Sequence, residues 1–439
     1  MIKDLILFHG VFFLATLNPA AQGQETSATR YRNVQAQHLS ADERIVYYEK
    51  RLKQSPNDPK LETALASAFI QKLRETTDFA YLNRASALVG RILATDPRSY
   101  DGIRLSAEIE THRHNFSKAA DLAQELIERN PSDAGSFGIL GDSLMEMGRY
   151  DEAGDAYQRM LEIGLNLTSY NRVAYQKFVT GNSNEAVSWM SLAVKAGSAV
   201  PENRAWCLVE FGDMLFKIGR TEDARSAYKQ ALEVLPGYHR ALASQAKQYA
   251  AEEKFDQALQ NYQRAQSVIP LPEYVAASAI LYEKLGQKTQ ADQQRKVIDV
   301  IDKLGRANGE KGNRMLALVY ADENRNLDRA LELVKAELEN RKDVYTYDAF
   351  SWVLFRSGRQ KEAEEASTKA LALHTPDPML LYHGGVIAMA AGKREQGSVL
   401  LRQALALNPT FSYPQADDAK QKLPQAGVVA TLNASATAP

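Results

Sequence analysis

The chain has 439 residues, with 53 Lys or Arg and 54 Asp or Glu, so its formal net charge at pH 7 is −1. This balance leaves no overall positive field to attract nucleic acid or an anionic membrane surface, and nucleic-acid binding is therefore disfavoured. Cys207 is the only cysteine, which excludes an intramolecular disulfide and a CxxC site, and its place between Trp206 and Leu208 favours a buried thiol over a catalytic one.

The first 23 residues have the pattern of an export signal. Lys3 precedes an apolar run over residues 5–17, and Ala21 and Gly23 then supply the small residues that a signal peptidase requires. The run is short for a membrane span, so an uncleaved anchor is the weaker alternative. We therefore expect residues 1–23 to be a signal peptide, and the mature chain to be periplasmic or secreted with no integral membrane span.

The segment after the signal is expected to become ordered only gradually. Residues 24–39 are polar, show no apolar period and predict a flexible lead-in. Ser40 and Glu43 then form a capping-box pattern, which predicts a helix over 40–56. A single helix in this place can act as the N-terminal cap of a repeat array.

The block 205–236 predicts two short amphipathic helices. Leu208, Gly212 and Leu215 lie on one face of the first helix. The second helix ends at Pro236, which has no N–H to continue the hydrogen-bond ladder. Neither helix can bury its apolar face alone, so the block should pack against neighbouring blocks of the same kind.

The same residue types return at a fixed interval. Ala224, Tyr228, Ala231 and Pro236 recur 34 residues later as Ala258, Tyr262, Ala265 and Pro270. A helix-turn-helix unit with this period resembles the tetratricopeptide repeat. The resemblance implies an all-α, right-handed α-solenoid of about ten helix pairs over residues 57–410, with the clearest repeats at 134–166, 205–270 and 344–410. It also implies a concave groove lined by the first helix of each pair.

The chain is expected to end in a cap and a tail. Residues 411–423 predict a C-terminal capping helix that covers the last apolar face of the stack. Residues 424–439 lack a periodic apolar set and predict a disordered tail. The block from Asp343 to Asn408 is similar to secreted bacterial repeat proteins of this family whose role is unassigned.

No motif in the sequence predicts catalysis. Gly141-Asp-Ser-Leu144 spells an esterase signature, but Gly141 and Leu144 are needed in the repeat core, and no Asp-x-x-His follows to activate the serine. His112 and His114 are a close pair, but no cysteine or further histidine lies nearby to complete a zinc site. We therefore expect no enzyme activity, no cofactor and no metal.

The resemblance also raises the question of a known peptide clamp. Some cochaperones of this family hold a terminal carboxylate between lysines, asparagines and an arginine on successive first helices. The corresponding faces here carry Trp206, Glu210 and Asp213 in one repeat and Arg240 and Lys247 in the next, without the asparagine of the clamp. Binding of a chaperone tail is therefore in doubt.

The last two full repeats predict a partner-binding surface. Residues one step beyond their core positions are rotated by about 100° and should face the groove. Many of them are aromatic, as in the hot spots of peptide-binding surfaces. The predicted residues are Tyr345, Asp348, Trp352, Phe355, Tyr382, His383, Val386 and Met389, and a second choice is Arg172, Tyr175, Phe178 and Trp206. Alternatively, these rings pack against adjacent helices, or the tail folds back over them.

Together these features predict an exported scaffold that binds a protein or peptide of unknown identity in the groove of the solenoid. The alternative is an accessory subunit, or a carbohydrate-gripping component, of an envelope polymer assembly or an enzyme complex. Turnover of a substrate by the isolated protein would favour the alternative.

Overall fold

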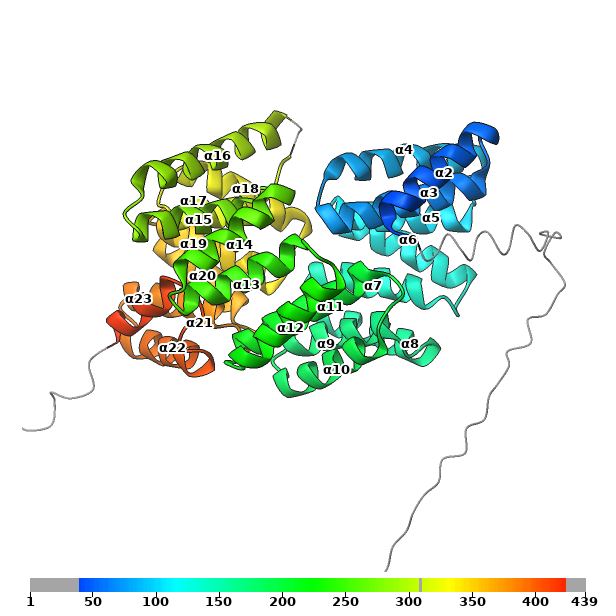
Figure 1. Ribbon diagram of the computed structural model, residues 1–439. Helices are drawn as coiled ribbons and strands as arrows, with labels where there is room; N and C mark the ends of the chain where they lie inside the picture. The colour runs from blue at the N-terminus through cyan, green and yellow to red at the C-terminus, as the bar shows by residue number, and fades with distance from the viewer. Residues whose placement is uncertain (1–38, 308–309, 424–439) are drawn as a thin grey trace, which may run out of the picture. The chain divides into compact units, whose positions relative to one another are not determined.

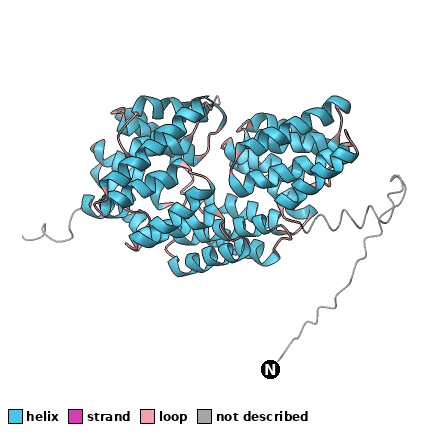
Figure 2. Ribbon diagram, turned by 45° about the horizontal axis from the view of Figure 1, so that its top comes forward, coloured by secondary structure: helices cyan, strands magenta, loops and turns pink. Residues whose placement is uncertain are grey.

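The computed structural model describes residues 39–307 and 310–423. The predicted signal peptide over 1–23, almost all of the lead-in over 24–39 and the predicted tail over 424–439 lie outside this range. Within the described range the chain forms 22 helices and no β-strand. In Figure 2 helices joined by loops make up the coloured part of the chain. The predicted all-α solenoid is therefore confirmed as the fold class.

Twenty of these helices form ten consecutive pairs, which Figure 1 labels in chain order. The first helices of the pairs are α3 (Pro59–Thr76), α5 (Tyr100–His112), α7 (Ala134–Glu146), α9 (Leu167–Val179), α11 (Pro201–Lys217), α13 (His239–Ala251), α15 (Pro272–Lys284), α17 (Arg314–Asp322), α19 (Val344–Arg356) and α21 (Pro378–Ala390). The second helices are α4 (Phe79–Thr95), α6 (Phe116–Arg129), α8 (Tyr150–Ile163), α10 (Ser183–Ala196), α12 (Thr221–Val234), α14 (Phe255–Val268), α16 (Lys288–Ala307), α18 (Leu327–Asn340), α20 (Gln360–Ala370) and α22 (Arg394–Leu407). Each first helix packs against its own second helix, and most also pack against the next first helix.

One helix precedes the pairs and another follows them. The helix α2 (Ala41–Gln54) lies within the predicted capping range 40–56 and packs against α3. The helix α23 (Gln415–Lys422) lies within the predicted range 411–423 and packs against α22. The part of the chain from Ala41 onward is one compact unit.

A glycine in the first helix sets how closely the two helices of a pair approach. A Cβ atom added to Gly212 would overlap the ring of Tyr228 on the paired helix. The hydroxyl of Tyr228 donates a hydrogen bond to the carboxylate of Asp213 at 2.8 Å, which fixes the ring over the glycine. Gly141 and Tyr157 repeat the same contact in the third pair. The recurrence of small and aromatic residues in the sequence therefore reflects this packing.

Three loops that follow second helices dock on the ends of first helices located five pairs earlier in the chain. The backbone N–H of Lys342 donates to the carbonyl of Glu146 (2.8 Å), Thr375 Oγ1 donates to the carbonyl of Val179 (2.5 Å), and Asn408 Nδ2 donates to the carbonyl of Phe216 (2.7 Å). Each acceptor lies in the last turn of a helix, where carbonyls lack the usual partner four residues on, although the Phe216 carbonyl also accepts the N–H of Gly219 at 3.1 Å. The three contacts therefore cap helix ends and join helix pairs that are distant in sequence.

Candidate functional site

Three cavities lie along the first helices of the pairs. Their volumes are about 510, 460 and 370 Å³, and we call them the first, second and third chambers. Arg240 lines both the first and the second chamber, and the residues shared by the second and third chambers are Lys217, Lys247, Tyr262, Glu273 and Met315. Because neighbouring chambers share wall residues, they follow one another along the first helices, and we call the series of three the inner channel.

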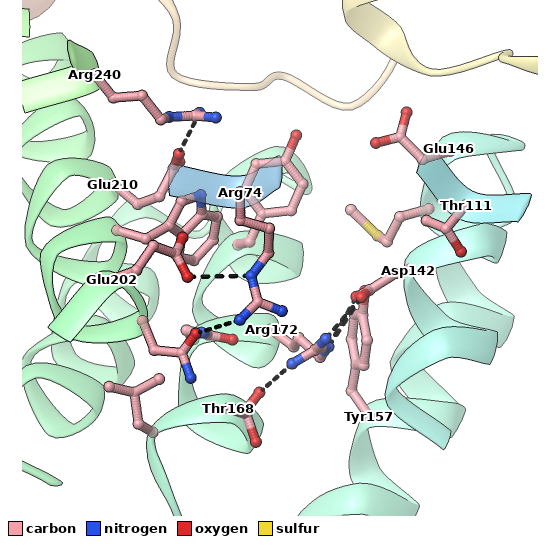
Figure 3. A pocket seen from close by; sticks show the side chains of 16 residues that line it. Arg74, Thr111, Asp142, Glu146, Tyr157, Thr168, Arg172, Glu202, Glu210 and Arg240 are labelled. Atoms are coloured by element: carbon pink, nitrogen blue, oxygen red, sulfur yellow. Dashed lines mark hydrogen bonds and ion pairs between the residues drawn. The ribbon is translucent and has the colours of Figure 1, made fainter. Parts of the chain in front are cut away.

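Ion pairs between neighbouring first helices line the first chamber (Figure 3). Arg172 on α9 lies 2.8 Å from Asp142 on α7, and Arg240 on α13 lies 3.3 Å from Glu210 on α11. Burial raises the pKa of Glu210, and the guanidinium of Arg240 opposes this rise. These pairs join adjacent repeats and leave the chamber lined by charges of both signs.

A further ion pair spans the first chamber. Nε of Arg74 on α3 lies 3.1 Å from the carboxylate of Glu202 on α11, and Nη2 of the same arginine donates to Asn203 Oδ1 at 3.0 Å. The helices α3 and α11 are not neighbours in the array, so this side chain reaches across the space between them. Figure 3 shows Arg74 between Glu202 and the Arg172–Asp142 pair.

Lys217 marks the place where the second and third chambers meet. Its Nζ atom lies 2.9 Å from the carboxylate of Asp377 at the start of α21. The same ammonium group lies 5.5 Å from the ring centre of Phe178 and 5.2 Å from that of Tyr345. Burial alone would lower the pKa of Lys217, but the Asp377 carboxylate raises it above its usual value. Lys217 therefore stays charged and ties α11 to α21.

The third chamber has an apolar wall between two carboxylates. Ile280 on α15 and Leu318 on α17 are half-buried there, and Met315 is 36% exposed. Glu273 lies in the first turn of α15 and Asp322 at the end of α17. Burial raises the pKa of both carboxyl groups, although Asp322 meets solvent and accepts a hydrogen bond at 2.7 Å from the indole N–H of Trp352.

A comparison with protein families agrees with this architecture. A family model described as "Tetratricopeptide repeat" matches residues 112–164 and 209–273, which include parts of the helix pairs around the first and second chambers. The chain contains tetratricopeptide repeats (TPRs). The resemblance expected from the 34-residue period is therefore confirmed.

Three proteins that resemble this chain share only a low sequence identity with it. A stretch of 258 residues is 23% identical to the DnaJ homolog subfamily C member 7 homolog of Schizosaccharomyces pombe, covering 54% of this chain and 53% of that protein, so the chain spans about half the length of that relative. The structure of PilF from Pseudomonas aeruginosa is 15% identical with a TM-score of 0.40, covering 46% of this chain and 91% of PilF. That of yeast Tom70 is 12% identical with a TM-score of 0.38, covering 90% of this chain and 93% of Tom70.

The structure divides the first-choice binding residues into two groups. Tyr345, Asp348 and His383 line the third chamber. Trp352, Tyr382 and Val386 are only 4%, 6% and 7% exposed, and Phe355 and Met389 pack against the same core. The expectation that all eight face the groove is wrong, because in a TPR array the seam between consecutive first helices is buried as well as the face toward the second helix. A binding role for these residues stays a prediction.

An aromatic stack accounts for the buried group. The rings of Trp352 and His383 are stacked with their centres 4.2 Å apart, and the hydroxyl of Tyr382 donates to Asp418 at 2.7 Å. Nδ1 of His383 lies 2.9 Å from the carboxylate of Asp348. Burial alone would lower the pKa of His383, but Asp348 raises it above its usual value. These contacts join α19, α21 and α23 in the TPR stack.

The second-choice residues are also divided. Arg172, Tyr175 and Trp206 line the first chamber, whereas Phe178 is 2% exposed and packs in the core beneath it. Glu273 and the residues of the apolar wall also line a chamber but were not among the residues predicted from the sequence. The rule that a residue one position beyond a core residue faces the groove was not applied to the seventh and eighth TPRs. There it predicts Ala277 and Leu318, which both line the third chamber.

The side chains that were considered for chemistry are occupied in packing. Ser143 is buried, and its hydroxyl donates to the carbonyl of Ile139. Cys207 is buried, and burial raises the pKa of its thiol to about 12. Burial lowers the pKa of His112 to about 4. Across residues 39–307 and 310–423, no group of His, Cys, Asp and Glu is placed to hold a metal ion, and no helix is long and apolar enough to cross a membrane.

Proposed function

We propose that this TPR protein is an exported scaffold that binds an extended segment of a partner protein in its inner channel. The observation that supports the proposal most directly is the succession of three adjacent chambers along the first helices. Concave sites with a mostly apolar lining and a few placed polar groups are typical of ligand binding. A channel that many repeats build together can contact a long segment at many points.

The pair Arg74–Glu202 favours an extended segment over a helix. The pair crosses the first chamber, with Nε of Arg74 3.1 Å from the Glu202 carboxylate, and so divides the space that a ligand could fill. A helix with its side chains is about 10–12 Å across, whereas an extended strand is thinner and exposes its carbonyl and N–H groups to side chains of the wall. Polar side chains such as Asn171 and Asn203 line the same chamber.

Site-specific crosslinking tests this proposal. Ser244 lines the second chamber, and Ser226 is exposed on the second helix α12. Either serine is replaced by cysteine and labelled with a thiol-reactive photocrosslinker, because the buried thiol of Cys207 should not react. We expect Ser244→Cys to capture a partner from the native extract and Ser226→Cys to capture none. Capture by Ser226→Cys alone would contradict binding in the channel.

Export rests on the sequence pattern of residues 1–23. Mass spectrometry of the protein from its native source is expected to find a mature chain that begins near Gln24. An intact Met1 on protein from the cytoplasmic fraction would contradict export and would leave the proposal of channel binding standing.

A further inference from the structure

The apolar wall of the third chamber is open to the channel. Met315 is 36% exposed, and Leu318 and Ile280 keep part of their surface toward the cavity. Exposing such side chains in a concave site costs free energy that a bound apolar group would recover, at about 25 cal/mol per Å² removed from water. Because Met315 and Met379 are flexible, the wall can adapt to more than one apolar side chain.

The two carboxylates of this wall lack a close cation. Across the described residues, neither Glu273 nor Asp322 has a Lys, Arg or His nitrogen within 4.0 Å; Arg240 and Arg314 act on Glu273, and His383 and Arg356 on Asp322, only from farther away. The other carboxylates of the chamber are paired, since Asp377 binds Lys217 and Asp348 contacts His383. Glu273 and Asp322 are therefore available to a cation from outside.

The positions of the carboxylates set a spacing. The first helices of consecutive repeats run in the same direction, so Glu273 near the start of α15 and Asp322 at the end of α17 flank the apolar wall. The ends of α15 and α17 carry the same cap bonds, so Lys284 corresponds to Asp322, and the eleven steps of 1.5 Å from Glu273 to Lys284 separate the two levels by about 17 Å. In an extended peptide, residues i, i+2 and i+4 share one face and span about 13 Å, and the long side chains of Lys or Arg at i and i+4 can cover the remaining distance.

Lys247 is a cation of the channel for which the described part of the chain supplies no carboxylate within ion-pair distance. Lys247 lines the second and third chambers and is half-buried, and its Nζ atom lies 5.9 Å from the ring centre of Phe216. Lys217 and Arg314 are instead held by Asp377 and Asp343. The ammonium group of Lys247 can therefore donate to a carbonyl of a peptide main chain.

We propose that the third chamber binds an extended peptide segment in which an apolar residue is flanked by two Lys or Arg residues, each two positions away. The apolar side chain packs on Met315 and Leu318, and the two cations pair with Glu273 and Asp322. This inference rests on the proposed function and names the class of partner. An anionic segment would bring its charges against both carboxylates and is disfavoured.

Three synthetic peptides with blocked ends test the inference by calorimetry. The first is Ala-Lys-Ala-Leu-Ala-Lys-Ala, the second has Glu in place of both Lys, and the third has Ser in place of Leu. We expect the first to bind at least about tenfold more tightly than the other two, and to weaken as salt rises. If the second or the third peptide binds more tightly than the first, the inference is contradicted, whereas the proposal that the channel binds peptides still stands. Binding of none contradicts both proposals.

Variants of the two carboxylates test whether the first peptide binds at the third chamber. Glu273→Gln and Asp322→Asn should each weaken the first peptide about fivefold to tenfold, because each removes one charge-assisted contact. The amide oxygen in Asp322→Asn can still accept the bond from Trp352, and Glu273 has no side-chain partner to lose, so both variants should fold. Glu365→Gln, on the exposed face of α20, is the matched control and should bind as wild type does. Equal affinities in all four proteins would overturn the assignment.

Discussion

Gly212 shows how one residue controls the packing of a helix pair. A Cβ atom at this position would overlap the ring of Tyr228, which is held by its bond to Asp213. We expect Gly212→Ala to lower the free energy of unfolding by about 1–3 kcal/mol, as overpacking typically does. Gly90 on α4 is the control: its Cβ would meet nothing within 4 Å, and Gly90→Ala should raise stability by about 0.5–1 kcal/mol. Urea unfolding measures both, and a stable Gly212→Ala variant would contradict the packing described.

The titration of Glu146 should change the free energy of unfolding as the pH changes. Burial raises the pKa of its carboxyl group from 4.5 to about 7, and Asp343 adds to the rise although Arg341 lies 2.6 Å away. Because the folded state binds this proton more tightly, its contribution to stability is complete below about pH 4.5 and is lost as the pH rises through about 7.

Replacing this residue gives the second prediction. Glu146→Gln should lose less free energy of unfolding than wild type between pH 4.5 and 8, because the variant has no proton to release. His383 also has a raised pKa and acts with the same sign, so the measured quantity is the difference between the two proteins. Identical pH dependence of wild type and variant would show that Glu146 titrates normally.

At the scale of elements, the docking of loops on helix ends gives a third prediction. Asn408 is buried and caps the carbonyl of Phe216, and its Oδ1 atom accepts the N–H of Thr410. Asn130 is the matched control, because it stands before a proline at the same place of an earlier pair, makes the same local bond to Ser132, and is exposed.

The two substitutions should therefore differ. Asn408→Ala removes the side-chain donor to the Phe216 carbonyl, which then keeps the N–H of Gly219 at 3.1 Å, and should cost about 0.5–1.5 kcal/mol, whereas Asn130→Ala should cost clearly less. Denaturant titrations of both variants measure the difference. Equal losses would show that the contact between α22 and α11 contributes nothing to stability.

The helix pairs could be predicted from the sequence because their signals are local. The apolar period, the stop at Gly219 and the close approach at Gly212 all depend on residues within one repeat. The prediction that Trp352 faces the groove was wrong because it, too, used only residues within one repeat. The sequence of one helix does not show how much of its surface the neighbouring helices bury. Here the helices before and after α19 both pack against it.

At the scale of the whole molecule, the contacts between helix pairs that are distant in sequence could not be predicted from one repeat. The bonds from Lys342 to Glu146 and from Thr375 to Val179 join residues almost 200 positions apart, and no sequence period records them. They depend on small rotations between successive pairs that add up along the array. The course of the inner channel depends on the same rotations, so the sequence indicated a groove but not the position of its chambers.

The accessibility of one thiol in the channel tests binding there most directly. Once a partner has been captured, the rate at which Ser244→Cys reacts with a small maleimide is measured with and without it. The account predicts that a saturating partner slows this reaction at least about tenfold and leaves Ser226→Cys on the outer helix unchanged. An unchanged rate at Ser244→Cys, with slowing at Ser226→Cys, would place the partner outside the channel and contradict the account.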